Sequence, residues 1–303
     1  MNPQNPNQSP AQTQIPDPDD RQLIPGLYVI ATPIGNARDI TLRALDMLRG
    51  ADVLLVEDSR VSAKLLSLHG IRKPLISLHD HNESRSIQSL MERVRKGERL
   101  ALLSDAGTPL VSDPGYKLVR AFIAEGLFVT HLPGPSAVLT GLVLSGLAPD
   151  RFLFCGFLPA KAGERRRAIA GDQDANATLI YFESGQRLAK SLADLAELLG
   201  PRPAVVAREL TKLYEQVRRA PLDALAVHYA EAPPPKGEIV LVISGPLLPE
   251  PVSEARLDEA LRAALAHASV KEAAQSVAAE LGLPKRQVYQ RALALAQADG
   301  DET

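Results

Sequence analysis

The sequence predicts an α/β protein of two domains, each a mainly parallel sheet flanked by helices, with a small helical region after them. Short apolar runs alternate with helical patterns in both domains. Each of the first five runs ends in a turn that contains Gly, Pro, Asp or Asn, and open parallel sheets bind ligands outside the carboxyl ends of their strands. We therefore expect one cleft. The turns that would form it are residues 32–36, 57–60, 79–83, 104–115 and 132–137.

The first domain is expected over residues 23–149, after a tail (1–22) whose Asn, Gln, Pro and Asp content predicts disorder. The helix after the first turn carries Leu42, Leu45 and Leu48 on one face. Glycines are expected to end this helix and the next three. The predicted strands are residues 27–31, 53–56, 75–78, 100–103 and 128–132, and the glycines are Gly50, Gly70, Gly97 and Gly126.

The second domain is expected over residues 150–246, after a linker at 148–150. A Pro-rich stretch at 246–251 then breaks the chain, and the Ala- and Leu-rich residues 254–298 predict three helices that resemble a helix-turn-helix. The predicted strands of the second domain are residues 152–155, 178–182, 204–208 and 238–243, with 214–219 as a candidate edge strand.

Length and composition bound the function. The 303 residues suit two or three domains, and a net charge of -2 excludes a globally basic nucleic-acid-binding protein. The single cysteine, Cys155, excludes an internal disulfide framework and fits a reducing compartment, where we expect it to be a strand residue. No apolar run of 18 residues and no secretory signal pattern occurs, so we expect a cytoplasmic protein.

The loop at residues 104–115 is the strongest local sign of a ligand site. It contains two Gly, two Pro, two Asp, two Ser and one Thr directly after a buried strand. Gly107 and Thr108 offer backbone N–H groups and a hydroxyl, and Asp105 and Asp113 offer acceptors, a set that suits an amino-acid-like or nucleoside-like ligand. The chain has neither a GxGxxG fingerprint nor a P-loop.

The turn at 79–83 contains His79 and His81, which would share one face of a strand. A catalytic zinc site usually takes three protein ligands, and no third ligand follows at a matching distance. We therefore expect no metal and a polar rim that orients a substrate.

Two basic clusters, residues 161–167 and 285–291, are candidate RNA phosphate contacts. They lie near the predicted cleft and on the helix-turn-helix-like region, although such clusters are often solvated helix faces. Aromatic residues make up 4% of the chain and Trp is absent, so we expect phosphate contacts to dominate over base stacking. The candidate RNA-binding residues are Arg60, Lys161, Arg165, Arg166, Arg167, Lys212, Lys285 and Arg286.

The order of several motifs identifies a resemblance. The turns above, followed by Phe-Leu-Pro-Ala-Lys (157–161), Phe-Glu-Ser (182–184), Arg-Glu-Leu-Thr-Lys (208–212) and Lys-Gly-Glu (236–238), resemble the tetrapyrrole methylase (class III S-adenosylmethionine methyltransferase) superfamily. Within it, the chain is similar to the ribosomal RNA small subunit methyltransferase I family from Leu27 to about Gly245, and its C-terminal helices resemble that family's tail.

The resemblance implies two α/β domains with S-adenosyl-L-methionine in the cleft between them. It implies 2′-O-methylation of a cytidine in the decoding centre of 16S rRNA, with the small ribosomal subunit as partner, and a homodimer. Carried over residue by residue, it places the cofactor against the strand ends of both domains, with Thr108 where the superfamily usually has Asp. The implied cofactor-binding residues are Pro33, Gly35, Gly107, Thr108, Pro109, Val111, Ser136, Ala137, Phe182, Ala207 and Gly237.

A base that accepts the proton of the 2′-hydroxyl would assist transfer by about 10²- to 10⁴-fold. The favoured candidates follow strands of the first domain, beside the cofactor loops, and other residues of both domains are alternatives. The favoured candidates are Glu57, Asp58, His79 and Asp80, and the alternatives are Glu83 of the first domain and Glu209, Lys212 and Glu238 of the second.

Two other functions remain open from the sequence. A C-methyltransferase of a corrin or sirohaem precursor would use the same fold and cofactor, and the Arg165–Arg167 cluster with the helical C-terminus favours RNA over it. A non-catalytic ribosome-assembly factor that binds RNA would have little use for the 104–115 loop.

Overall fold

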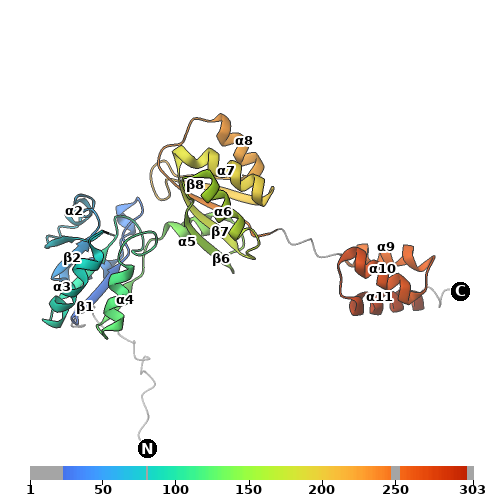
Figure 1. Cartoon of the computed structure of the whole chain (residues 1–303), viewed down its shortest axis with the longest axis horizontal. Helices are drawn as coiled ribbons and strands as arrows, with labels where there is room; N and C mark the ends of the chain where they lie inside the picture. The colour runs from blue at the N-terminus through green and yellow to red at the C-terminus, as the bar shows by residue number, and fades with distance from the viewer. Residues whose placement is uncertain (1–22, 80, 247–252, 299–303) are drawn as a thin grey trace, which may run out of the picture. The chain divides into compact units, whose positions relative to one another are not determined.

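The computed structural model describes residues 23–79, 81–246 and 253–298, so the tail predicted at 1–22 and the candidate base Asp80 lie outside it. The chain divides into two compact units, with the boundary after Pro246 (Figure 1). No helix in the described residues has the length and apolar character needed to cross a lipid bilayer.

The first sheet is parallel throughout, in the order β3-β2-β4-β1-β5. Its strands match the predicted runs to within one residue, because a parallel sheet covered on both faces is built from continuous apolar segments. The parallel direction brings all five carboxyl ends to one edge. The strands are β1 (Gly26–Ile30), β2 (Val53–Val56), β3 (Leu75–Ser77), β4 (Arg99–Leu103) and β5 (Val129–Leu132).

Helices cover both faces of this sheet. The helices α1 (Leu42–Gly50) and α2 (Ser59–Leu68) pack on one face, and α3 (Glu83–Arg95) and α4 (Tyr116–Ala124) pack on the other. Gly70, Gly97 and Gly126 follow α2, α3 and α4 with φ angles of 64°, 100° and 67°, which confirms them as helix ends.

One residue of the predicted apolar face of α1 differs from expectation. Leu45 and Leu48 are buried, whereas Leu42 is 80% exposed. Leu42 is the first residue of α1, and a helical side chain points toward the N-terminal end, where this helix has no further turn over the sheet.

The second sheet has the order β6-β7-β10-β8-β9 and differs from the mainly parallel sheet that was predicted. Only β6 and β7 pair in parallel, and the other three pairs are antiparallel. The predicted strands are all present, and the candidate edge strand is β9. The strands are β6 (Phe152–Phe157), β7 (Thr178–Ser184), β8 (Pro203–Arg208), β9 (Gln216–Pro221) and β10 (Glu238–Ile243).

Burial explains why the sequence did not reveal these directions. Helices α6 (Ala162–Asp172), α7 (Gly185–Leu199) and α8 (Leu222–Glu231) cover one face of the second sheet. Helix α5 (Ala137–Ser145), which follows the last strand of the first domain, packs on the other face (Figure 1). Strands covered on both faces are apolar in either direction, so the pattern carries no information on direction.

Gly185, the first residue of α7, lies so close to Pro235 that any side chain would overlap the carbonyl oxygen of Pro235. We expect Gly185→Ala to lower the free energy of unfolding by about 2–3 kcal/mol, because backbone must shift. Gly163→Ala in α6 is the matched control, since open space surrounds Gly163 and alanine favours a helix by about 0.5–1 kcal/mol. Urea denaturation followed by circular dichroism measures both. Equal stability of the two variants would contradict the prediction.

The second unit consists of the three predicted helices, α9 (Glu254–Leu265), α10 (Val270–Leu281) and α11 (Lys285–Ala298). They enclose a small core of their own. Ser269 and Glu272 form a capping box at the start of α10, and Arg291 of α11 forms a 2.6 Å ion pair with Asp258 of α9. These features explain how so short a segment keeps one arrangement of its helices.

Candidate active site

Two loops at the carboxyl edge of the first sheet are joined by hydrogen bonds. Thr32, after β1, exchanges N–H···O bonds of 2.9 and 3.0 Å with Gly107 of the 104–115 loop. The Thr32 hydroxyl donates to the carbonyl oxygen of Ser104 (3.1 Å), and the Ser104 hydroxyl donates to that of Gly107 (3.0 Å). Buried polar groups that satisfy one another in this way hold the loops in one conformation.

The 104–115 loop has a strained backbone. Leu110 and Ser112 have φ angles of 73° and 68°, in the left-handed region that costs a non-glycine residue about 1–2 kcal/mol. Gly107 and Gly115 adopt 82° and 117°. Strain of this kind concentrates at functional sites, and it supports the prediction that this loop shapes a ligand site.

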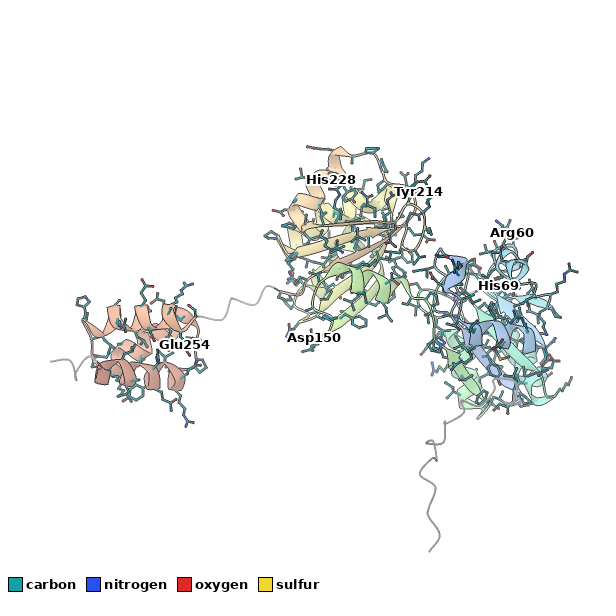
Figure 2. All side chains as sticks on the ribbon, turned by 180° about the vertical axis from the view of Figure 1, so that it is seen from behind. Arg60, His69, Asp150, Tyr214, His228 and Glu254 are labelled. Atoms are coloured by element: carbon teal, nitrogen blue, oxygen red, sulfur yellow. The ribbon has the colours of Figure 1, made fainter. Side chains whose placement is uncertain are left out.

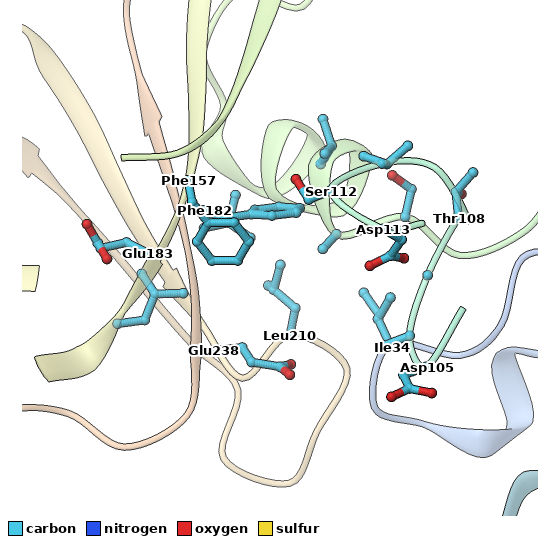
Figure 3. Close-up of a pocket in the computed structure, with 18 residues that line it drawn as sticks. Ile34, Asp105, Thr108, Ser112, Asp113, Phe157, Phe182, Glu183, Leu210 and Glu238 are labelled. Carbon is cyan, nitrogen blue, oxygen red and sulfur yellow. The ribbon is translucent and has the colours of Figure 1, made fainter. Parts of the chain in front are cut away.

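A cavity of about 270 Å³ lies beside this loop, and both α/β domains line it (Figure 3). The first domain contributes the 104–115 loop, α5 contributes its first turn, and the second domain contributes the ends of β6, β7 and β10. The lining residues are Ile34, Asp105, Ala106, Gly107, Thr108, Val111, Ser112, Asp113, Ser136, Ala137, Val138, Phe157, Phe182, Glu183, Leu210, Glu238, Ile239 and Val240.

The cavity has an aromatic side and an acidic side. The ring of Phe182 contacts that of Phe157 edge-to-face, with ring centroids 5.4 Å apart. Figure 3 shows both rings across the cavity from Asp105 and Asp113. Those two carboxylates have no cationic partner in the described structure, and no Lys or Arg is among the lining residues. This arrangement suits a flat ring system joined to a positively charged group.

Asp113 is a partly buried carboxyl with a raised proton affinity. Burial, followed by the nearby charges of Glu57 and Asp105, raises the pKa of Asp113 to about 6, although a hydrogen bond with Ser104 opposes the shift. Burial also raises the pKa of Asp105. A carboxylate whose pKa lies near 6 can accept a proton close to neutral pH.

Glu183 has a different role from the other acidic lining residues. Its carboxylate accepts from the Ser191 hydroxyl (2.5 Å), from Arg187 (2.7 Å) and from the backbone N–H of Ser184 (2.7 Å). Figure 3 shows it pointing away from the cavity. Glu183 therefore fixes the turn between β7 and α7, and with it the position of Phe182.

A second cavity of about 280 Å³ adjoins the first and shares Ile34, Asp105, Ala106 and Glu238 with it. Lys212 lines this cavity, and its ammonium group donates to Glu209 (2.8 Å) and Glu238 (2.9 Å). Gly35 lines it too, and a side chain at Gly35 would overlap Lys212. The absence of a side chain at Gly35 is therefore what admits Lys212.

The predicted cofactor residues divide into those that line a cavity and those that support one. Gly107, Thr108, Val111, Ser136, Ala137 and Phe182 line the first cavity, and Pro33 and Gly35 line the second. Pro109 borders a separate surface hollow beside α4. Ala207 is fully buried in the second sheet. Gly237 has a φ angle of 98°, and a side chain at this position would overlap that of Glu209. The Thr108 hydroxyl donates to the carbonyl oxygen of Pro135 (3.1 Å).

None of the three favoured base candidates that the structure describes lines either cavity, whereas of the alternatives Lys212 lines the second cavity and Glu238 lines both. Asp58 caps α2 and pairs with Arg60 (2.7 Å), and hydrogen bonds from Arg60 lower its pKa to about 2. Glu57 acts on the site through Asp113, whose pKa it raises. The backbone N–H of His79 donates to the Asn82 side-chain oxygen (2.9 Å), and the His79 ring packs near that of His81.

Among the described residues, no group of three His, Cys, Asp or Glu side chains is placed to hold a metal ion.

The first basic cluster is largely paired within the fold. Arg165 is buried and forms a 2.6 Å ion pair with Asp194 of α7. Arg166 pairs with Asp194 (3.0 Å) and Glu197 (2.5 Å). Of the other candidate RNA contacts, Lys161 pairs with Glu164 at an exposed position. Arg167, Lys285 and Arg286 are exposed, and no ion pair involves them in the described structure.

Several lining residues are not among the predicted site residues, and three of them matter most. Asp113 is predicted only as an acceptor in its loop, because no spacing reveals its burial. Phe157 opens the Phe-Leu-Pro-Ala-Lys motif, and its aromatic ring in an aromatic-poor chain is the sign that could have found it. Leu210 sits inside the Arg-Glu-Leu-Thr-Lys motif, where the charged neighbours are the more prominent candidates.

Comparison with known proteins agrees with this geometry. A family model described as Tetrapyrrole (Corrin/Porphyrin) Methylases matches residues 26–226. A protein of Mesorhizobium japonicum named ribosomal RNA small subunit methyltransferase I is 46% identical over 291 residues, which cover 96% of this chain and 98% of that protein. The chain belongs to the ribosomal RNA small subunit methyltransferase I family.

Other members of the ribosomal RNA small subunit methyltransferase I family agree over most of the chain. The proteins of that name from Escherichia coli O157:H7 and Pseudomonas aeruginosa are 42% and 43% identical, each over 88% of this chain and 94% and 96% of their own lengths. A second family model, RsmI C-terminal HTH domain, matches residues 251–296, so the relation extends into the helical unit.

Two solved structures share the fold of this chain. A structure titled cobalt precorrin-4 methyltransferase has a TM-score of 0.54 at 19% identity and covers 74% of this chain and 96% of its own. A diphthine synthase structure has a TM-score of 0.56 at 17% identity, over 72% and 89%. These likenesses confirm the predicted two-domain tetrapyrrole-methylase fold.

Proposed function

We propose that this protein transfers a methyl group from S-adenosyl-L-methionine to the ribose 2′-hydroxyl of a cytidine in the decoding centre of 16S rRNA. The observation that carries the proposal is the 42–46% identity to relatives named for the small-subunit rRNA, over most of the chain. A cavity at the carboxyl edge of a parallel sheet, between two domains, supports it.

The chemistry of the cavity fits S-adenosylmethionine. Phe157 and Phe182 offer aromatic surface for the adenine ring. Asp105 and Asp113 offer negative charge to the sulfonium and ammonium groups. The first turn of α5, at Ser136 and Ala137, presents the positive end of a helix, which favours the carboxylate.

When bound, the cofactor supplies an electrophilic methyl group on its sulfonium. Transfer would require a cleft that orients the ribose hydroxyl toward this methyl group and excludes water. A carboxylate of this chain would accept the proton that the ribose hydroxyl loses on transfer. We assign this acceptor to Asp113, because it lines the cavity with a pKa near 6. Glu57 raises its proton affinity.

The proposal extends to the partner and the assembly. The substrate is the small ribosomal subunit or a late precursor of it, in the cytoplasm, and the active form is a homodimer. Phosphates of the rRNA are held by the exposed cations Arg60, Arg167, Lys285 and Arg286. Since Arg165 and Arg166 are paired internally, they serve the fold of the second domain.

The deciding experiment incubates labelled S-adenosylmethionine with the protein and small subunits from a strain that lacks it, then digests the 16S rRNA and separates the nucleosides. We expect label in 2′-O-methylcytidine. Label in a base or in another nucleoside would contradict the assigned acceptor. Cofactor binding without label in RNA would instead favour a small-molecule methylase, and no cofactor binding would favour the non-catalytic RNA-binding alternative.

A further inference from the structure

The 209–215 loop, which joins β8 to β9, is held rigidly beside the cleft. The backbone N–H of Glu209 donates to the carbonyl oxygen of Glu238 (3.0 Å), and that of Thr211 donates to the carboxylate of Glu215 (2.7 Å). The ammonium group of Lys212 ties the loop to Glu238 of β10 (2.9 Å). Glu209 and Thr211 adopt φ angles of 51° and 65°, so surrounding contacts must maintain this conformation.

The loop also bridges the two α/β domains. The backbone N–H of Asn36, in the first turn of the first domain, donates to the Thr211 hydroxyl (3.1 Å). Leu210 is buried and lines the first cavity, whereas Lys212 lines the second. The next two residues therefore project from a point that is fixed relative to both cavities.

Those next two residues are unusually exposed. Leu213 is 88% exposed, the largest fraction among the exposed large apolar side chains of the described structure. Tyr214 is 70% exposed, more than any other described Phe or Tyr. Figure 2 shows Tyr214 on the side of the second domain nearest the first. Leu213 and Tyr214, unlike Leu210 of the same loop, contribute nothing to the core, so this exposed pair is suited to a partner.

Charge next to the loop identifies the class of partner. Arg38, two residues after Asn36, is exposed, and so is Lys236, whose carbonyl oxygen accepts from Arg208 at the end of β8 (2.9 Å). Neither Arg38 nor Lys236 has an ion-pair partner in the described residues. Exposed aromatic rings and unpaired cations on neighbouring segments are the groups that bind unstacked nucleotides, with a ring under a base and cations on phosphates.

We propose that Leu213 and Tyr214 form a stacking platform for an unpaired base of the rRNA next to the methylated nucleotide, with Arg38 and Lys236 on the adjoining phosphates. The inference rests on the proposed function and deepens it, because it names residues that select an unstacked RNA strand. The platform holds the strand open so that the target ribose enters the cleft. Phosphate contacts alone, as expected from the scarcity of aromatic residues, would not distinguish single-stranded from paired RNA.

The kinetic test compares Tyr214→Ala, Tyr214→Phe and the control Val227→Ala, which truncates another exposed apolar residue (61%) on α8. We expect Tyr214→Ala to raise KM for small subunits by about 5- to 100-fold, the effect of losing one stacked base. Tyr214→Phe should keep the wild-type KM, since stacking needs the ring and not the hydroxyl. The affinity for S-adenosylmethionine should be the same in all three variants.

A direct test uses the absence of Trp from the chain. Tyr214→Trp introduces a single indole fluorophore on the platform, and Val227→Trp introduces one on α8 as the control. Small subunits should quench the emission of the Tyr214→Trp variant only, because base stacking quenches indole fluorescence. Binding of small subunits without quenching at position 214 would overturn the proposal.

Labelling of RNA by the wild-type protein distinguishes a failure of the platform from a failure of the proposed function. Sedimentation of the protein without RNA distinguishes RNA binding from a contact between two copies of the chain. If the wild-type protein places no label in RNA, the proposed function fails, whatever the variants do. If the wild-type protein labels RNA and Tyr214→Ala has the wild-type KM, only the platform fails. If Tyr214→Ala instead changes the sedimentation of the protein in the absence of RNA, the patch joins two copies of this chain and the proposal is overturned.

Discussion

Asp113→Asn is expected to lower the rate of methyl transfer by about 10²- to 10⁴-fold, the contribution of a general base. The wild-type rate should rise with pH through about 6, as Asp113 loses its proton, and this rise should disappear in the variant. Single-turnover kinetics with labelled cofactor between about pH 4.5 and pH 8 measures both effects. The affinity for the cofactor should fall less than the rate, because Asp105 still faces its positive charge.

Two variants distinguish this assignment from its competitors. Glu57→Gln removes a charge that raises the pKa of Asp113, so the pH profile should move to lower pH with turnover retained. Asp58→Asn should keep turnover within the same order of magnitude, since Arg60 already holds the pKa of Asp58 at about 2. If Asp58→Asn lowered the rate of methyl transfer as much as Asp113→Asn does, the general base would be Asp58 and not Asp113.

The same substitution at Asp113 should stabilise the fold at neutral pH. The pKa of Asp113 is higher in the folded chain than in the unfolded chain, so its contribution to stability is complete below about pH 4 and is lost as pH rises through about 6. Asp113→Asn removes this loss of unfolding free energy at neutral pH, which amounts to about 2–3 kcal/mol. Denaturation of the cofactor-free protein at about pH 7.5 and about pH 4 should therefore show a gain at the higher pH only.

Asp194→Ala is expected to lower the free energy of unfolding by about 3–5 kcal/mol, because it leaves the buried guanidinium of Arg165 without a counter-charge. The side chains of Arg165 and Asp194 are only 6% and 14% exposed. Chemical denaturation is the measurement. An effect of this size would show that the cluster at 161–167 supports the second domain and does not lie free for RNA.

Glu197→Ala is the matched control for this loss. It removes the exposed partner of Arg166 and leaves Asp194 in place, so we expect less than about 1 kcal/mol. Arg167→Ala, at the exposed end of the cluster, should leave stability unchanged and weaken binding of small subunits. A stable Asp194→Ala variant that binds small subunits poorly would instead place Arg165 at the RNA surface.

The strands and the layer of helices could be predicted because apolar runs and glycine ends are local features. The direction of β10 could not, because a strand covered on both faces has the same apolar composition in either direction. The sequence around α5 likewise does not indicate that this helix packs on the second sheet. Its packing partners, such as Val240 and Val242, lie on β10, the last strand of that sheet along the chain.

The turns predicted the place of the cavity and Gly107 within it, whereas Ser136 and Phe182, which also line it, were expected only from the family resemblance. The base was not, because proton affinity depends on burial, and the burial of Asp113 results from a loop that folds back on Thr32. The internal pairing of Arg165 was hidden for a related reason. A run of arginines is typical of an exposed surface, and the partner Asp194 lies 29 residues away on another helix.

Asp105 and Asp113, the two carboxylates without a counter-ion in the described structure, have a consequence for turnover on the proposed function. Methyl transfer converts the sulfonium into a neutral thioether, and the proton taken up by Asp113 cancels one of the two negative charges. Electrostatic attraction between protein and cofactor is thus strongest before the reaction and weakest after it. The charges that attract the reactant therefore attract the product less, which favours release of the spent cofactor.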